Sequence, residues 1–276
     1  MAQSFRELMI LRNNPPPMLR RGLGALGILL VVFVWWLLTR GASAETRIIS
    51  PVLLPSPGEV VRSVPGLFTE RGLIESTVAT LKRVLSGFGL AILVGVPLGI
   101  VISRHEWLAA PMLGVATVIL TLPSIALFGL MIPIFSRFGQ GIGAVPAIVA
   151  VFLYSLLPIM RNTYLALRNV DAGIKEAGVG IGMTYWQRLR LVDLPLAVPV
   201  ILGGVRTAVV MNIGVMTIAA VIGAGGLGSL IIRAIGQSSM MKLLVGAVLV
   251  SLLAIVADLA LQALQRLLTP KGVQKA

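Results

Sequence analysis

The segment KEAGVGIGMTYWQRLRLVDLP, residues 175–195, is a polar and basic stretch between two long hydrophobic blocks. Just before it, Asp171 is placed to cap a short helix over about residues 172–181. Gly182 follows, and a glycine at this point can end the helix in the left-handed conformation. The first half of the stretch therefore predicts a short capped helix that ends in a glycine corner.

The second half of the stretch predicts another helix. Thr184, followed three residues later by Gln187, is the pattern of a capping box at a helix start. We expect Pro195 to end this second helix, because proline lacks the backbone N–H that a helix interior needs. Both flanks are apolar enough to be buried in lipid, so the unit of helix, corner and helix is expected to lie on a membrane surface.

Composition decides the class of protein. The chain has 276 residues, of which 57% are hydrophobic and only 12% are charged. A soluble surface needs roughly a quarter of charged residues, so these values predict an all-α polytopic membrane protein. Six apolar segments come close to or exceed the roughly 20 residues that cross the hydrocarbon layer, namely 22–38, 77–102, 107–132, 145–160, 197–222 and 243–264.

Charge and residue content exclude several other classes. The net charge of +13 comes from basic residues spread over loops beside apolar segments, which fits lipid headgroups and the positive-inside rule better than nucleic acid. The chain has no cysteine, which excludes disulfides and thiolate metal sites, and its single histidine, His105, excludes a histidine metal site. We therefore expect no metal, no cofactor and no nucleic acid on this chain.

The polar stretch also resembles a known motif. The motif has the pattern E-A-A, then three residues, G, nine residues, I, one residue and L-P. Seven residues stand at its fixed positions, namely Glu176, Ala177, Gly178, Gly182, Val192, Leu194 and Pro195. This pattern is the EAA loop of the membrane-spanning subunits of ABC importers. Gly178 stands where a second alanine is usual and Val192 where isoleucine is usual. The glycine is expected to cost the first helix about 1 kcal/mol relative to alanine.

The resemblance implies a fold and a set of partners. The fold would be that of a type I ABC importer permease, with about six transmembrane helices and the EAA loop as a cytoplasmic coupling helix. The partners would be a dimer of cytoplasmic ABC ATPases, a second permease subunit that is identical or homologous, an extracytoplasmic substrate-binding protein and the lipid bilayer. The location would be a bacterial-type inner (plasma) membrane.

These expectations divide the chain into five parts, which are a cytoplasmic tail at 1–21, a first transmembrane helix at 22–39, an extracytoplasmic connection at 40–76, a permease core at 77–265 with the EAA loop at 161–196, and a cytoplasmic tail at 266–276. A short amphipathic helix is expected near residues 53–68.

The start of the chain has a second interpretation. The small residues Ala42, Ser43 and Ala44 after a basic start also fit a cleaved signal peptide. Trp35 and Trp36 before them favour a retained helix.

Basic residues predict the orientation. With the N-terminus inside, 13 of the 23 Lys and Arg residues lie on the side of the EAA-like loop and 9 on the other side, with Arg206 inside a segment. The positive-inside rule then places the loop and both termini in the cytoplasm.

Two nucleotide motifs are excluded. Residues 223–228, GAGGLG, match G-x-G-x-x-G, but an apolar membrane segment precedes them and Val248 stands where the acidic residue of a dinucleotide site would be. The chain has no G-x-x-x-x-G-K-[ST] sequence. We therefore expect no catalytic residues, and ATP hydrolysis is expected on a separate partner.

Four residues inside the segments attract attention. Arg206 and Asp258 fall at similar depth in the last two segments, and because an unpaired charge in lipid is costly we expect them to pair or to line a wet cavity. The pair suits a structural role first and a role in gating second. Met211 and Met216 could form an apolar gate, or they could face lipid or packed neighbours.

The solute is indicated by resemblance alone. Residues 145–237 resemble permeases for glycine betaine, choline and carnitine, which makes osmoprotectant import the leading hypothesis. Residues 53–68 resemble importers of taurine, alkanesulfonate or nitrate, which form the main alternative. A channel or secondary transporter that works alone is a third hypothesis, although such proteins usually carry more charges or broken helices at the midplane.

Overall fold

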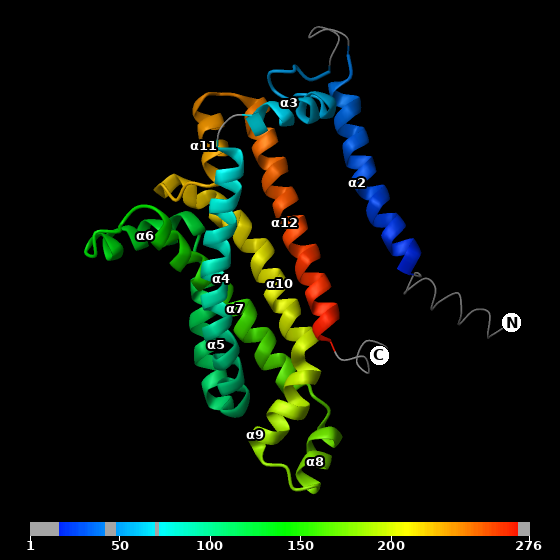
Figure 1. Ribbon diagram of the computed structural model, residues 1–276, viewed down its shortest axis with the longest axis vertical. Helices are drawn as coiled ribbons and strands as arrows, with labels where there is room; N and C mark the ends of the chain where they lie inside the picture. The colour runs from blue at the N-terminus through cyan, green and yellow to red at the C-terminus, as the bar shows by residue number, and fades with distance from the viewer. Residues whose placement is uncertain (1–16, 42–47, 70–71, 270–276) are drawn as a thin grey trace, which may run out of the picture.

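The computed structural model describes residues 17–41, 48–69 and 72–269, and every regular element within these ranges is a helix (Figure 1). The all-α class predicted from the sequence is confirmed. Four of the described helices are long and apolar enough to cross a membrane, and a bent pair of shorter apolar helices brings the number to five if the pair is counted as one span. The sixth expected span, α2 (Pro17–Thr39), is 23 residues long, and that it crosses the membrane stays a prediction.

The first helices depart slightly from their expected bounds. α2 begins at Pro17, inside the stretch expected as a tail. α3 (Pro57–Thr69) is the amphipathic helix expected near this position, and its start is fixed by Glu59, whose carboxylate accepts a hydrogen bond from the Ser56 N–H at 2.8 Å. α4 (Leu73–Arg104) begins four residues before the expected core boundary.

The segment expected as a span at 107–132 is broken into two helices. The chain instead forms α5 (Glu106–Thr121) and α6 (Ser124–Ser136), which meet at an angle of 101°. Pro123 causes the break, because it drives Leu122 into an extended conformation with ψ of 133° and offers no N–H of its own. The Tyr154 hydroxyl donates to the Leu122 carbonyl, so this oxygen is satisfied at the break.

The core lies between α4, α7 (Ala144–Arg168) and α10 (Leu194–Ile218). α4 packs against α7 through small residues, as membrane helices commonly do. A Cβ added at Gly87 would lie 2.6 Å from the Ile148 carbonyl oxygen, so the two backbones approach too closely for any larger side chain. Gly99, about three turns further along α4, meets Thr163 just as closely.

The chain leaves the core through a turn and two further helices. The short 3₁₀ helix η2 (Ala219–Ile222) leads to the glycine turn, α11 (Leu227–Gly236) follows, and α12 (Met240–Leu268) is the last span. The Leu227 N–H donates to the Thr80 hydroxyl at 2.8 Å, so the glycine turn is fixed on α4. No strand precedes this turn in the described chain, in agreement with the rejection of a dinucleotide site.

Between α7 and α10 the chain forms α8 (Ala172–Gly180), α9 (Tyr185–Arg188) and the π-helix η1 (Leu189–Asp193). Figure 1 shows α8 and α9 at one end of the molecule, with α3 and α11 at the other. The polar stretch 175–195 therefore lies at the end of the spans, as its sequence predicts.

Candidate functional site

The loop between α7 and α10 begins with a helix that is capped as expected. The Asp171 carboxylate accepts a hydrogen bond from the Ile174 N–H at 3.1 Å and starts α8. Gly182 follows the helix with φ of +83°, a left-handed conformation that a side chain would strain. The Met183 N–H donates to the Gly178 carbonyl at 3.0 Å and closes the corner. The helix and its glycine corner are thus as the sequence predicts.

The second helix also starts as expected but does not end as expected. Thr184 and Gln187 form a capping box, in which the Thr184 N–H donates to the Gln187 side chain at 2.8 Å. The prediction that Pro195 ends this helix is wrong, because helical structure continues from Tyr185 to Ile222 over 38 residues. The π-helix η1 explains the difference.

In η1 the Leu194 N–H reaches back five residues to the Leu189 carbonyl. This wider turn comes just before Pro195, which then occupies the first turn of α10, where the missing N–H of a proline costs no hydrogen bond. α9, η1 and α10 are therefore one continuous helical body from Tyr185 to Ile222, and the glycine corner separates α8 from it.

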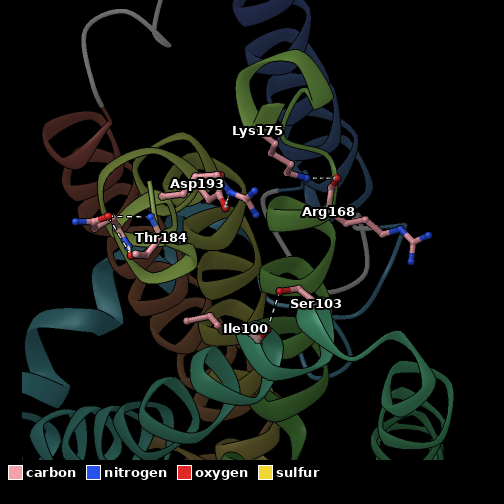
Figure 2. A network of polar contacts seen from close by, with 8 residues as sticks. Ile100, Ser103, Arg168, Lys175, Thr184 and Asp193 are labelled. Atoms are coloured by element: carbon pink, nitrogen blue, oxygen red, sulfur yellow. Dashed lines mark hydrogen bonds and ion pairs between the residues drawn. The ribbon is translucent and has the colours of Figure 1, made fainter. Parts of the chain in front are cut away.

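Polar side chains brace this loop against its surroundings (Figure 2). The Lys175 ammonium donates to the Arg168 carbonyl at 3.1 Å, which ties α8 to the end of α7. The Arg168 guanidinium pairs with Glu106 at the start of α5. Arg188 binds Asp193 across η1, with 3.2 Å between Nε and Oδ2. Asp193 is only 4% exposed, so this pair is shielded from water.

An aromatic contact joins the loop to α4. The Arg104 guanidinium lies over the ring of Tyr185 at 4.6 Å from the centroid, and Arg188 lies 5.9 Å from the same ring. These residues surround a polar cavity of about 290 Å³ between the ends of α4, α7 and the loop. Such cation–π contacts are worth about 0.5–1 kcal/mol each at exposed sites. The loop is thus connected directly to the ends of α4 and α7 as well as to α10, and Arg168 of α7 extends the connection to α5.

The outer surface of the loop is left without partners. Glu176 and Ala177 are exposed, and no described residue forms an ion pair or side-chain hydrogen bond with the Glu176 carboxylate. Apolar side chains of the same loop are also exposed, namely Val179 at 61%, Ile181 at 75%, Trp186 at 63% and Leu191 at 67%. Exposed apolar side chains become a candidate interaction surface where they form one patch.

The remaining motif residues hold the loop together. Gly178 is buried, and a Cβ added there would lie 3.3 Å from Cγ and Cδ of Arg188, so the small residue lets this side chain cross α8. Val192 is half-buried in η1, and Leu194 packs against the cluster that contains Leu189 and Ala197. Glu176 and Ala177 therefore face outward, while Gly178 and Leu194 face inward.

The structure brings Arg206 and Asp258 together between α10 and α12. Both carboxylate oxygens of Asp258 accept from the guanidinium at 2.9 Å. The Arg206 Nη1 also donates to the Gln265 oxygen at 3.2 Å, and the Gln265 Nε2 donates to the Pro199 carbonyl at 2.9 Å. The charges of this pair are satisfied within the chain.

The structure does not bring Met211 and Met216 together. Met216 is 1% exposed in the core, whereas Met211 is 45% exposed. Five residues of helix separate their directions by about 140°. Within one subunit the two side chains therefore do not share a face, and only Met211 is open to a neighbour or a path.

Sequence reasoning missed four residues of the loop network, which are Arg104, Glu106, Tyr185 and Asp193. Arg188 and Asp193 stand five residues apart, a spacing that a π-turn brings together and an α-helix does not, and this was the available signal. The contacts of Arg104 and Glu106 join residues far apart in sequence and carry no local signal. Among the described residues no group of three His, Asp or Glu side chains could hold a metal ion.

Comparison with known proteins agrees with this geometry. Residues 91–271 match the family described as "Binding-protein-dependent transport system inner membrane component". The chain is 64% identical over 186 residues to the osmoprotectant import permease protein OsmW of Salmonella typhimurium, which covers 67% of this chain and 86% of that protein. It is 44% identical to the glycine betaine/carnitine/choline permease OpuCB of Bacillus subtilis, over 67% of this chain and 83% of that protein.

A solved structure shares the fold. The inward-facing MetNI methionine ABC transporter matches with a TM-score of 0.65 and 24% identity, over 72% of this chain and 98% of that chain. The fold is that of type I ABC importer permeases. The family match covers more than half of the chain, and two relatives exceed 40% identity. The chain therefore belongs to the family of binding-protein-dependent transport inner membrane components, the permease subunits of ABC importers.

Proposed function

We propose that this chain forms the translocation path for a small osmoprotectant, such as glycine betaine, choline or carnitine, in an ATP-driven importer. The observation that carries the substrate class is its similarity to OsmW and OpuCB, whose names state osmoprotectant and glycine betaine/carnitine/choline transport. Import of taurine, alkanesulfonate or nitrate has no comparable support among these relatives.

The loop 171–195 docks on a separate cytoplasmic ATPase. Its exposed apolar side chains and the unpartnered carboxylate of Glu176 support this role. Its continuity with α10 supports a mechanism, because a rigid-body tilt imposed on α8 and α9 passes through η1 into the span. The braces to α4, α5 and α7 carry the same tilt to the rest of the core.

The complete importer contains two permease subunits, two ATPases and an extracytoplasmic binding protein. The loop and both termini face the cytoplasm, with 13 basic residues on that side against 9 on the other. The membrane is a bacterial-type inner membrane. Asp258 and Arg206 hold α12 on α10, and the binding protein supplies the aromatic cage that a quaternary ammonium ion needs, because this chain has only 5% aromatic residues.

The test is uptake in cells that carry the chain and its native partners. Cells that express the complex should accumulate labelled glycine betaine, choline or carnitine, and a deletion of the gene should remove this uptake. Labelled taurine and nitrate serve as the competing substrates. Uptake of taurine or nitrate without uptake of any quaternary ammonium compound would overturn the proposed substrate class.

The separate ATPase is tested by purification in a gentle detergent. An ATPase should co-purify with the wild-type chain. With Glu176→Lys the ATPase should no longer co-purify, or its ATP hydrolysis should no longer be stimulated by substrate. Gln140→Lys is the matched control, because it places the same charge on an exposed turn at a distance from the loop. Transport by a preparation without any ATPase would favour the channel or secondary transporter.

A further inference from the structure

The end of the core that lies opposite the loop between α7 and α10 is basic. Figure 1 shows α11 at this end, with α8 and α9 at the other. Five basic residues belong to the segments that form it, namely Lys82, Arg83, Arg137, Arg233 and Lys242. From residue 76 to residue 257 the sequence has four acidic residues, and all belong to the loop or the helix ends beside it, namely Glu106, Asp171, Glu176 and Asp193.

This positive charge is not neutralised within the described chain. None of the five basic residues forms an ion pair with a described residue. Residues 40–75, which lead to the core at the same end, carry four arginines and four glutamates, so they do not offset the excess. The basic end therefore has a net positive charge that a partner could complement.

Contacts between elements bring the first of these residues to the glycine turn. A Cβ added at Gly225 would lie 3.6 Å from Nη1 of Arg83, so the guanidinium rests against the turn. This Nη1 atom is buried and has no hydrogen-bond partner among the described residues. The segment after α6 packs on the same turn, because the Gly143 N–H donates to the Ile222 carbonyl at 3.0 Å. Arg137 caps the end of α6, where this segment begins.

α11 leads from the glycine turn to two further basic residues. Arg233 and Gln237 are four residues apart, a spacing that places them on one face of a helix. The Lys242 ammonium donates to the Gln237 side-chain oxygen at 3.2 Å, which holds it near Arg233. Arg137, Arg233 and Lys242 are all exposed. Exposed basic side chains thus follow the glycine turn on both sides in the chain, with Arg83 packed against the turn.

The kind of partner follows from charge. In the orientation proposed above this end is extracytoplasmic, where the positive-inside rule does not call for basic residues. Anionic lipid is concentrated in the opposite, cytoplasmic leaflet. A second copy of this chain would bring the same positive charge and could not neutralise it. Phe138, next to Arg137, is 74% exposed, and both phenylalanine and arginine are enriched in protein interfaces. An acidic protein surface fits these observations best.

We propose that the surface formed by Arg137, Arg233 and Lys242 around the glycine turn docks an acidic face of the extracytoplasmic binding protein. Asp and Glu side chains of the partner pair with these residues, and Phe138 makes an apolar contact beside them. Arg83 raises the positive potential of the surface. Such complementarity speeds the encounter and sets the orientation of the docked partner. The inference rests on the proposed function only in requiring a binding protein, and it does not depend on which solute is carried.

Direct binding tests the surface. The complete importer is placed in phosphatidylcholine nanodiscs, and association of its purified native binding protein is measured. The triple variant Arg137→Gln, Arg233→Gln, Lys242→Gln should weaken binding about tenfold, mainly through slower association, and Arg233→Gln alone about threefold. Wild-type binding should weaken as salt is added, and binding by the triple variant should change less.

Two controls separate charge from other effects of substitution. The double variant Arg137→Lys, Arg233→Lys keeps the charge and should bind as wild type. Arg161→Gln removes one charge from an exposed position of α7 nearer the loop, so it should not change binding. Thermal unfolding of each purified complex checks that the variants are folded.

The alternatives give different results. Equal binding by the wild type and the triple variant would overturn the proposal. A loss of binding that appears only in nanodiscs containing phosphatidylglycerol would assign the basic residues to lipid headgroups and would also overturn it. The proposed function is judged separately by uptake. An importer that takes up no quaternary ammonium compound can still show charge-dependent docking, and one that takes them up can fail to show it.

Discussion

The loop between α7 and α10 and the polar cluster between α10 and α12 use similar residues in opposite ways. In the cluster, Arg206, Asp258 and Gln265 satisfy one another and the Pro199 carbonyl within the chain. In the loop, Arg188 and Asp193 form an inner ion pair, but Glu176 and several apolar side chains are exposed, and the Glu176 carboxylate has no partner among the described residues. The comparison separates a cluster that joins two helices within the chain from a loop that keeps an exposed carboxylate and exposed apolar side chains, the features on which the proposed docking rests.

The largest effect is expected from breaking the cluster. Arg206→Leu leaves the Asp258 carboxylate without its partner inside a span, and we expect a loss of about 3 kcal/mol in the free energy of unfolding. Thermal unfolding of the purified complex and its amount in membranes measure this loss. The double variant Arg206→Leu, Asp258→Leu should recover most of it. A double variant as unstable as the single one would show that the pair itself is not the cause.

The next effect is expected at the glycine corner of the loop. Gly182→Val forces a β-branched residue into a φ of +83°, which costs about 1–2 kcal/mol and should lower uptake about fivefold or more. Gly180→Val is the matched control, because Gly180 lies in α8 with open space around its Cα. Equal uptake by the two variants would contradict a role for the corner. Labelled substrate uptake per amount of complex is the measurement.

A smaller effect is expected at the brace to α4. Tyr185→Leu removes the ring under Arg104 and Arg188, and the lost contacts amount to about 1 kcal/mol. ATP hydrolysis should persist while uptake per ATP falls about twofold to fivefold. Tyr185→Phe keeps the ring and should behave as wild type. If both variants lose the same amount, the hydroxyl or the fold of α9 is responsible and the brace is not.

The smallest effect is expected at Gly178, where the EAA motif usually has alanine. Gly178→Ala adds a Cβ 3.3 Å from the flexible stem of Arg188, which has to shift by a few tenths of an ångström. Alanine also favours α8 by up to about 1 kcal/mol, so the two terms nearly cancel. Thermal unfolding should change by less than about 0.5 kcal/mol. A larger loss would show that the path of Arg188 across α8 is essential.

Much of the loop could be predicted from the sequence because its signals are local. Asp171, Gly182, Thr184 and Gln187 each act on backbone groups a few residues away, and the structure confirms all four. The break at Pro123 and the continuation through Pro195 show why the effect of a proline is hard to predict. A proline can bend a span, end it or follow a π-turn, and the choice depends on which carbonyls neighbouring helices satisfy.

Contacts between distant elements could be predicted only where leaving a group without a partner would cost much free energy. Arg206 and Asp258 were expected to meet because lipid penalises an unpaired charge. No comparable cost links Arg104 to Tyr185 or Arg168 to Glu106 at the membrane surface, and these contacts became visible only in the fold. Met211 and Met216 were grouped by sequence proximity alone, and helix geometry separates them.

The central claim is that the outer face of α8 docks on a cytoplasmic ATPase, and site-specific labelling tests it most directly. The chain has no cysteine, so Ala177→Cys introduces a single reactive thiol on this exposed face. Membrane-impermeant maleimide should label it in inside-out vesicles stripped of ATPase, should fail to label it when the ATPase is bound, and should not reach it from the outside. Equal labelling with and without bound ATPase, or labelling from the outside, would contradict the account.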